Sequence, residues 1–280
     1  MTINLAVLIT CHNRKDKTLD CLHSLFNASL PLNYNLDVFL VDDGSTDGTS
    51  QLVKKNFPEV TIVLGDGNLF WNQGMRLAWK TASTKLAYDY YLWLNDDTMI
   101  YKHALDELLI CSDEAIQNSY KRSIIVGACE EFKGNKIFSY GGRTDQGKVI
   151  PNGNLQECTN INGNTVLIPN EIYQELGNLC NDYTHGIGDN DYGLRAIESG
   201  YKCYTSKTYI ATCTINETTQ WDNPEVSLRK RWQLFHSPLG LNIKEYNTFR
   251  KKFWGKKWIL FSLKAYTKVL FPKIYKIIKK

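Results

Sequence analysis

Continuous apolar runs of strand length alternate with stretches of helical period along the first hundred residues. The runs cover residues 5–10, 36–41, 61–64 and 90–94. The unbroken run over 5–10 is typical of a parallel strand covered on both faces. Between the runs, apolar residues recur at spacings of three and four, which predicts helices around residues 19–26, 52–53 and 73–83. Strands alternating with helices predict an α/β fold with a right-handed, mostly parallel sheet flanked by helices.

The pattern changes after a helix that is predicted over residues 101–117. Short strands are predicted over residues 124–128, 136–140, 164–168, 201–205 and 208–213, in surroundings rich in glycine and asparagine. Helices are predicted over residues 170–176 and 192–199, and Gly200 is a good stop for the second of them. We therefore expect the second half of the sheet to be mixed and rich in loops.

From Pro224 onward the pattern is helical and basic. One helix face carries Ile259, Leu263, Tyr266 and Leu270, and another carries Lys257, Lys264 and Lys268. Phe271-Pro272 interrupts this helix, and a short segment after it alternates Ile274, Ile277 and Ile278 with Lys273, Lys276, Lys279 and Lys280. No window approaches the roughly 18 apolar residues that a helix needs to span a bilayer. The tail is therefore expected to lie on a membrane without crossing it, or to pack on the rest of the protein through its apolar face.

The formal net charge of +4 conceals a strong asymmetry along the chain. Residues 229–280 hold 15 of the 33 lysines and arginines but only one acid, Glu245, so this tail carries +14 and the remainder −10. Such a split indicates a basic surface that meets something anionic, most often nucleic acid or a membrane.

Eight cysteines are scattered along the chain without the paired spacing of a zinc site. They do not suggest a disulfide framework either, so a reduced, cytosolic setting is the simpler interpretation. The N-terminal residues run directly into a predicted strand, so no signal peptide is expected. For 280 residues of ordinary globular composition we expect one large domain with an appendage.

Two predicted strands end in adjacent carboxylates. The run over residues 90–94 is followed by Asn95-Asp96-Asp97-Thr98, and the second strand by Asp42-Asp43. Buried carboxylates need a divalent cation, a basic partner, or a turn in which Asp97 and Thr98 cap a helix near Tyr101. In an open α/β sheet, ligands bind outside the carboxyl ends of parallel strands, so both pairs are expected to face one crevice. This shared position favours a metal site.

A third acidic cluster follows later in the chain, at His185-Gly186-Ile187-Gly188-Asp189-Asn190-Asp191. Its glycines predict a loop that approaches a ligand closely, and Asp191 is suited to cap the following helix. Asp189 has no such explanation, and a carboxylate beside a metal–phosphate site can take a proton from an attacking hydroxyl.

Five motifs follow one another in a recognisable order. They are Thr10-Cys11-His12-Asn13-Arg14, Val41-Asp42-Asp43-Gly44-Ser45-Thr46-Asp47, Gly67-Asn68-Leu69-Phe70-Trp71, Leu94-Asn95-Asp96-Asp97-Thr98 and Gly188-Asp189-Asn190-Asp191-Tyr192-Gly193-Leu194-Arg195-Ala196. Each is weak alone, but together they resemble family 2 glycosyltransferases over about residues 3–215. The bacterial rhamnosyl- and galactofuranosyltransferase-like members are the most similar.

The resemblance implies a GT-A, Rossmann-like fold and the inverting transfer of a sugar from a UDP- or dTDP-linked donor to an acceptor hydroxyl. We expect residues 1–223 to form the catalytic domain, with a nucleotide-binding half over 1–100 and an acceptor half over 101–223. A basic, amphipathic helical region over 224–280 would follow it.

The resemblance also assigns roles to single residues. Donor-binding positions fall on Thr10, His12, Arg14, Asp42, Asp43, Asn68, Trp71, Gly74 and Asp96. Asp97, with Asp96, would hold Mg²⁺ or Mn²⁺ against the diphosphate, and Asp189 falls at the position of the catalytic base. Their sequence context, and not the resemblance, makes His185, Asp191 and Trp221 candidates for the acceptor side.

The chain departs from the family pattern at two metal-site positions. Asn95 stands where the family often has an acid, and Cys213 stands where many relatives have a histidine that assists the metal. Coordination would then rest on Asp97, phosphate oxygens and water, and His185 is a possible substitute for the missing histidine. Among the tryptophans, Trp79 and Trp93 lie in core-like patterns, whereas Trp71 and Trp221 have polar neighbours and are better candidates for ligand contact.

We therefore expect a glycosyltransferase of bacterial surface polysaccharide synthesis that acts on a glycan or lipid-linked acceptor. It would be cytoplasmic and peripheral at the inner face of the plasma membrane, which it would contact through residues 255–280. One alternative is a nucleotidyltransferase acting on sugar phosphates, although residues 11–14 do not supply its Gly-rich, basic loop. Another is a non-catalytic sugar- or nucleotide-binding relative. No nucleic-acid partner is expected, because the predicted sheet lacks a stacking platform with interleaved cations.

Overall fold

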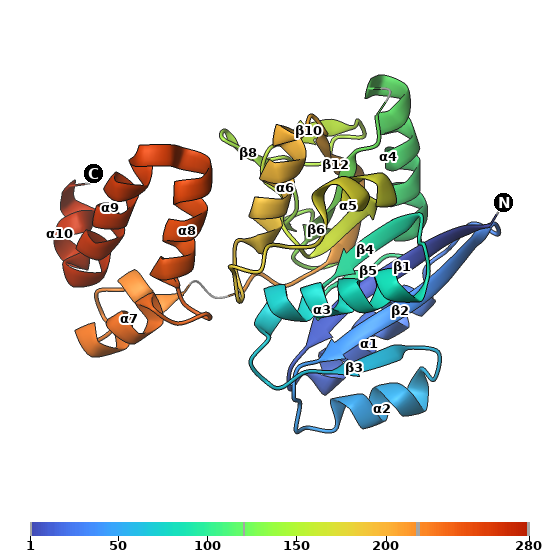
Figure 1. The fold of residues 1–280 in the computed structure, drawn as a ribbon, viewed down its shortest axis with the longest axis horizontal. Helices are drawn as coiled ribbons and strands as arrows, with labels where there is room; N and C mark the ends of the chain where they lie inside the picture. The colour runs from blue at the N-terminus through green and yellow to red at the C-terminus, as the bar shows by residue number, and fades with distance from the viewer. Residues whose placement is uncertain (1, 120, 217–218, 279–280) are drawn as a thin grey trace. The chain divides into compact units, whose positions relative to one another are not determined.

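The computed structural model describes residues 2–119, 121–216 and 219–278 of the chain (Figure 1). Lys279 and Lys280 lie outside the described residues, and the side chains of Lys276, Ile277 and Ile278 are not described, so the pattern predicted for these five residues is not tested. The chain divides into two compact units. The first unit comprises Met1–Leu179 and Asp189–Ile215, and the second comprises Cys180–Gly188 and Asn216–Lys280.

The N-terminal half of the first unit is a parallel sheet in the order β3-β2-β1-β4. Its strands are β1 Ile3–Cys11, β2 Tyr34–Asp42, β3 Thr61–Leu64 and β4 Tyr90–Leu94. Its helices are α1 Lys15–Phe26, α2 Thr49–Asn56 and α3 Phe70–Lys85. All four apolar runs therefore form strands, and the helices predicted between them are present.

The remaining strands extend this sheet on the side of β4. They are β5 Met99–Ile100, β6 Ile124–Glu130, β7 Phe138–Tyr140, β10 Gln156–Cys158, β11 Thr165–Pro169 and β12 Cys203–Thr212. A separate two-stranded sheet pairs β8 Arg143–Thr144 with β9 Gly147–Lys148. The helices of this half are α4 Ala104–Ser119, α5 Asn170–Leu176 and α6 Gly188–Glu198.

The main sheet has the order β10-β12-β6-β11-β4-β1-β2-β3. Only β10 and β11 run against the other six strands of this path. The predicted α/β fold with a mostly parallel sheet is therefore confirmed, and the antiparallel strands fall in the half that the sequence indicated to be mixed.

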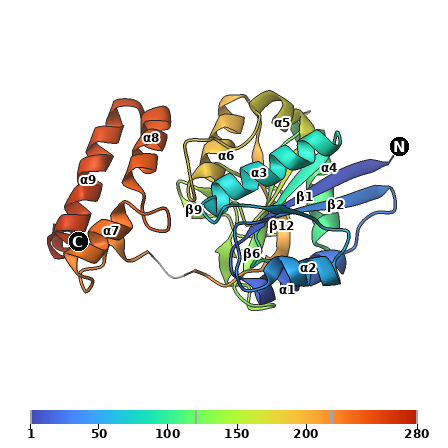
Figure 2. The same cartoon turned by 60° about the horizontal axis from the view of Figure 1, so that its bottom comes forward.

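Strand β1 shows why these runs are apolar at every position. Its odd-numbered residues Leu5, Val7 and Ile9 pack in a core cluster with residues of α1, α2 and α4. Its even-numbered residues Ala6 and Leu8 pack in a second cluster with residues of α3, α5 and α6. Figure 2 shows helices on both faces of the sheet. A strand covered on both faces has no solvent side on which polar residues would be favoured.

Three local predictions are wrong. Asp97 and Thr98 do not cap a helix, because β5 follows them and α4 begins only at Ala104. The two predicted closing strands are one continuous strand, β12, which has register shifts near Tyr209. Asp189 lies not in a loop but in the first turn of α6, which starts at Gly188 and so before the predicted cap at Asp191.

The second unit is helical. It contains η1 Gln220–Asp222, α7 Leu228–Phe235, α8 Ile243–Trp254, η2 Gly255–Lys257, α9 Trp258–Leu270 and α10 Pro272–Ile278. The break at Phe271-Pro272 is confirmed. A small core of Phe235, Leu241, Ile243, Ala265 and Val269 holds these helices together. No helix in the described part of the chain is both long enough and apolar enough to cross a membrane.

Segment 180–188 joins the second unit through Glu245, the single acid of the basic tail. The two carboxylate oxygens of Glu245 accept hydrogen bonds from Thr184, at 3.0 Å from the backbone N and 2.6 Å from Oγ1. Tyr183 also packs edge-on against Phe249, with ring centroids 6.5 Å apart. The carboxylate of Glu245 therefore has its hydrogen-bond partners inside the second unit.

Candidate active site

The carboxyl ends of three neighbouring parallel strands meet at one edge of the sheet. Strand β1 lies between β2 and β4, and its last residue, Cys11, is in register with Asp42 at the end of β2. Asp96 and Asp97 follow the end of β4 on the other side. The expectation that both acidic pairs share one edge is confirmed.

The two carboxylates after β2 hold the surrounding loops in place. Asp42 Oδ1 accepts from the backbone N of Ser45 at 2.9 Å, and Oδ2 accepts from the Ser50 hydroxyl. Asp43 accepts from the backbone N of Gly67 at 2.8 Å and of Phe70 at 2.9 Å. Asp43 therefore ties the end of β2 to the loop between β3 and α3.

The loop after β1 is fastened to the loop after β2. His12 Nδ1 donates to the backbone O of Asp43 at 2.5 Å, and Nε2 of this exposed side chain accepts from Asn13 Nδ2 at 3.1 Å. Asn13 donates from its backbone N to Ser45 Oγ at 2.8 Å and accepts from the backbone N of Thr46 at 2.7 Å. Its φ of 50° lies in the left-handed region that asparagine tolerates. Sequence reasoning missed this role of Asn13.

Arg14 is the partner of the paired carboxylates. Its Nη1 lies 2.8 Å from Asp96 Oδ1 and 3.1 Å from Asp97 Oδ2. Burial nevertheless raises the pKa of Asp96 to about 6, because desolvation of the carboxylate outweighs the attraction of Arg14. The sequence left three ways to compensate the acidic pair: a divalent cation, a basic partner or a helix-capping turn. The structure contains the basic partner, Arg14.

The metal-site departures have structural explanations. The indole N–H of Trp71 donates to Asn95 Oδ1 at 2.7 Å, so this amide oxygen is already engaged. The thiol of Cys213 donates to Asp97 Oδ1 at 3.8 Å, and its Sγ accepts from Asn164 Nδ2 at 3.1 Å. Burial and Asp97 raise the pKa of Cys213 to about 12, which keeps the thiol protonated at neutral pH.

Asp189 reaches this edge through the loop before β11. Its Oδ2 accepts from the backbone N of Gly163 at 2.9 Å, and the next residue, Asn164, accepts from the backbone N of Asn95 at 2.9 Å. The other oxygen of Asp189 accepts from Asn190, at 2.7 Å from the backbone N and 3.1 Å from Nδ2. Burial raises the pKa of Asp189, although these three hydrogen bonds oppose the shift.

Gly163 and Gly74 permit close packing next to the site. A Cβ at Gly163 would lie 2.3 Å from the Trp71 ring, and a Cβ at Gly74 would lie 2.2 Å from Thr10 Oγ1. Gly163 therefore brings the loop that holds Asp189 against Trp71, and Gly74 lets α3 pack directly on β1. No sequence signal pointed to Gly163, because it precedes a strand in a loop without a recognisable motif.

The remaining predicted residues lie in different places. Asn68 is exposed in the loop after β3, where its backbone N donates to Asp66 Oδ1 at 2.9 Å. Asp191 is fully buried and forms an ion pair of 2.7 Å with Arg195, which explains it as a structural residue of α6. His185 and Trp221 belong to the second unit, where Trp221 packs against Phe235 with ring centroids 5.7 Å apart. Trp79 and Trp93 are fully buried, so their predicted packing role is confirmed.

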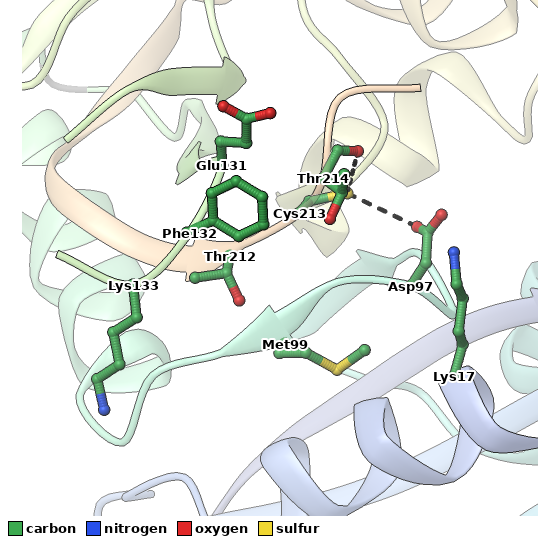
Figure 3. Close-up of a pocket in the computed structure, with 9 residues that line it drawn as sticks. All are labelled: Lys17, Asp97, Met99, Glu131, Phe132, Lys133, Thr212, Cys213 and Thr214. Atoms are coloured by element: carbon green, nitrogen blue, oxygen red, sulfur yellow. Dashed lines mark hydrogen bonds between the residues drawn. The ribbon is translucent and has the colours of Figure 1, made fainter. Parts of the chain in front are cut away.

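A pocket of about 240 Å³ lies next to Asp97 (Figure 3). Its lining residues come from α1, the β4–β5 turn, the β6–β7 connection and the end of β12; they are Lys17, Asp97, Met99, Glu131, Phe132, Lys133, Thr212, Cys213 and Thr214. Carboxylate, ammonium, hydroxyl and apolar groups all line it, so it suits a polar ligand group beside Asp97. Apart from Asp97 and Cys213, sequence reasoning missed these residues.

In the described part of the chain, no three or more histidine, cysteine, aspartate or glutamate side chains are grouped to hold a metal ion. Asp96 Oδ2 is buried, and no hydrogen-bond partner is found for it among the described residues. The edge therefore holds one buried carboxylate oxygen without a partner, next to an ion pair.

Residues 6–136 match the model of glycosyl transferase family 2. No curated protein sequence matches the chain.

Two solved structures illustrate the similarity in fold. TarS 1-349 of S. aureus in complex with UDP-GlcNAc superposes with a TM-score of 0.55 at 15% identity, over 87% of this chain and 66% of that one. The mannosyltransferase PcManGT from Pyrobaculum calidifontis, in complex with GDP-Man and Mn²⁺, gives a TM-score of 0.54 at 15% identity, over 78% and 58%. The chain thus spans less than two thirds of either protein. The family match, together with the shared fold, shows that the chain carries a family 2 glycosyltransferase domain with the GT-A fold.

Proposed function

We propose that this protein transfers a sugar, with inversion, from a UDP- or dTDP-linked donor to a hydroxyl of a glycan or lipid-linked acceptor. The observation that carries the proposal is the position of Asp189. Its carboxylate is bonded to Gly163, and the adjacent Asn164 is bonded to Asn95, immediately before Asp96 and Asp97. A base beside a carboxylate pair at the carboxyl edge of a parallel sheet suits transfer from a diphosphate donor.

The loops after β1 and β2 would bind the nucleotide. Thr10, His12 and Asp42 are the residues proposed for the base and ribose, and His12 is exposed with its Nδ1 fixed by Asp43. The guanidinium of Arg14 would bind the diphosphate, since its Nη1 lies at the same edge of the sheet, against Asp96 and Asp97. Asn68, Trp71 and Gly74 remain weaker proposals, because Trp71 and Gly74 have packing roles of their own.

Asp96 and Asp97 could supply some of the oxygen ligands of a divalent cation. Mg²⁺ typically binds to one or two carboxylates together with substrate phosphates, and Mn²⁺ prefers similar oxygen ligands. The unpartnered Oδ2 of Asp96 and the pocket-facing carboxylate of Asp97 supply such oxygens. Cys213 is not a suitable ligand, because a hard cation does not favour a protonated thiol. When bound, the cation would act as a Lewis acid that neutralises charge on the diphosphate.

The chemical step is a single displacement at the anomeric carbon. The acceptor oxygen bonds to this carbon, and the bond from the carbon to the diphosphate oxygen breaks with its electron pair going to the diphosphate. The proton of the acceptor hydroxyl passes to Asp189. An ionised carboxylate has about four acceptor positions. Three of them are occupied by hydrogen bonds in Asp189, so one remains for the acceptor hydroxyl. The raised pKa of Asp189 makes it a stronger base than an exposed aspartate.

The biological setting is a further part of the proposal. Synthesis of a bacterial surface polysaccharide would place the acceptor at the cytoplasmic membrane, and the protein would be cytoplasmic and peripheral there, in contact through residues 255–280. The one-sided charge of the tail supports this, since residues 229–280 carry +14. A similar fold binds UDP-GlcNAc in TarS and GDP-Man in PcManGT, so GDP sugars belong in any test.

The first experiment is thermal unfolding with UDP, dTDP, GDP and CMP sugars, each with and without Mn²⁺. A ligand at 100 times its dissociation constant adds about 2.7 kcal/mol to the free energy of unfolding. We expect one nucleotide class to raise the melting temperature, more strongly with Mn²⁺, and to serve as donor in a transfer assay. No response to any nucleotide would contradict the proposal.

Asp189→Asn then tests the base. Loss of a general base slows the chemical step by about 10² to 10⁴-fold, while the donor still binds. The matched control is Asp20→Asn, which neutralises an exposed aspartate of α1. A variant with unchanged transfer would remove Asp189 from the mechanism. A wild-type protein that binds donors and transfers nothing to any acceptor would be the non-catalytic relative, and pyrophosphate release from a nucleoside triphosphate and a sugar phosphate would indicate the nucleotidyltransferase.

A further inference from the structure

Helix α9 has two apolar sides, and only one of them packs within the second unit. Ala265 and Val269 are buried in the small core of the unit. Ile259, Leu260 and Leu263 are 49%, 69% and 59% exposed. Of the apolar stripe that the sequence indicated, Ile259 and Leu263 therefore face away from this core, whereas Tyr266 packs against it.

The exposed apolar residues share one side of the helix. Ile259, Leu263 and Leu270 are separated by four and seven residues, the spacing of a single helical face, and Leu260 lies at its margin. We call these four residues the outer face of α9. Phe271 and Ile274 follow it and are both 54% exposed. Contiguous exposed apolar side chains of this kind mark an interaction site, whereas scattered single ones do not.

Lysines accompany the outer face along the sequence. Lys256 and Lys257 precede α9 and Lys264 lies next to Leu263, all with exposed side chains. Lys251 lies over the ring of Trp258 at the start of α9, 4.4 Å from the ring centroid. After Glu245 the sequence contains no aspartate or glutamate, and Glu245 itself is bonded to Thr184.

We infer that the outer face of α9 inserts into the interface of an anionic lipid bilayer, with Lys256, Lys257 and Lys264 against the headgroups. Apolar side chains flanked by lysines are the pattern of helices that lie in the plane of a membrane. This inference deepens the peripheral contact proposed above by naming its residues and its lipid class. Binding to vesicles does not require transfer, so the two can fail separately.

The combination of groups selects a bilayer over other partners. A second copy of the chain would bring its own lysines against these lysines, which costs free energy through like-charge repulsion. A nucleic acid would use the lysines for its phosphates but would leave the exposed leucines without a role. An anionic bilayer has headgroups for the charges and acyl chains for the outer face.

The test is co-sedimentation of the full chain with phosphatidylcholine vesicles, with and without phosphatidylglycerol. We expect binding that requires phosphatidylglycerol and weakens with salt. Lys256→Glu/Lys257→Glu should weaken it by at least about ten-fold, because each basic residue near an anionic surface contributes about 1 kcal/mol. The matched control is Lys54→Glu/Lys55→Glu, which reverses an adjacent, exposed lysine pair on α2 and should leave binding within about two-fold of the wild type.

The apolar contribution is tested by Leu260→Ser/Leu263→Ser, which should also weaken binding by about ten-fold or more. Leu32→Ser/Leu86→Ser replaces two exposed leucines of the first unit and serves as the control. Circular dichroism and the melting temperature establish that each variant is folded.

Three results would overturn the inference. One is equal binding to neutral and anionic vesicles, and another is no difference between either variant and its control. The third is a dimer, or a complex with a nucleic acid, that forms through the outer face while no vesicle binding occurs.

Discussion

Strand β1 of the first unit and helix α9 of the second are both rich in apolar residues, but they place them differently. Every residue of β1 from Leu5 to Ile9 is buried between two layers of helices. Helix α9 buries Ala265 and Val269 and exposes larger residues such as Leu260. Charges follow the same division. Arg14 of the first unit pairs with two carboxylates, whereas the tail has many lysines and one acid. In the first unit these groups build the fold and its site, whereas in the second unit the outer face of α9 and its flanking lysines are exposed.

The largest expected effect comes from the apolar half of this comparison. Trp93→Ala removes a fully buried side chain of β4 and should lower the free energy of unfolding of the first unit by about 3 to 5 kcal/mol. Leu260→Ala removes an exposed side chain and should change it by less than about 0.5 kcal/mol. Urea unfolding followed by circular dichroism measures both. A large cost for Leu260→Ala would mean that the outer face is covered within the protein.

The charged half of the comparison predicts a pH dependence. The pKa of Asp96 is about 6 in the folded protein, against 3.8 for an ordinary aspartate. Well below pH 4 the carboxyl is protonated in both states and costs nothing. Between about pH 4 and pH 6 the carboxyl ionises in the unfolded chain but keeps its proton in the folded one, so the free energy of unfolding falls. The loss reaches up to about 3 kcal/mol and is complete above pH 6.

Asp96→Asn removes this ionisation. In buffer without divalent cations or nucleotides, the variant should become more stable than the wild type by up to about 3 kcal/mol between pH 4 and pH 7. Asp20→Asn, at an exposed position of α1, is the control and should follow the wild type. Parallel stability curves for Asp96→Asn and the wild type would show that burial does not strain this carboxylate.

Much of the fold could be predicted from the sequence because burial on two faces leaves a strong signal. A continuous apolar run such as residues 90–94 has few alternatives to a covered strand. The meeting of Asp42 with Asp96 and Asp97 then follows from the geometry of parallel strands. These features depend on the backbone, and local sequence determines the backbone there.

The details that were missed depend on contacts between distant segments. Arg14 and Asp96 are 82 positions apart, and nothing near either residue indicates that their side chains meet. Gly163 supports Asp189 only because Trp71 packs on it. In α9, small residues such as Ala265 lie on the buried side, while the larger residues Ile259 and Leu263 are exposed. Periodicity reveals that a helix has an apolar side, but not what covers it.

Arg14→Met has the smallest expected effect. It tests whether Arg14 alone compensates the negative charges of Asp96 and Asp97. The substitution leaves Asp96 and Asp97 without the guanidinium that lies 2.8 and 3.1 Å from them. Because Arg14 is partly exposed, water can replace it in part, and we expect a loss of about 1 to 2 kcal/mol in the free energy of unfolding. Mn²⁺ alone should restore more of this loss in the variant than it adds to the wild type, since a cation can occupy the vacated position. The electron paramagnetic resonance signal of free Mn²⁺ reports binding without any transfer assay. Lys17→Met removes a cation of α1 that lines the pocket of Asp97, and it is the matched control. If Mn²⁺ binds the variant no better than the wild type, Arg14 does not compete with a cation, and the two aspartates need another partner to bind one.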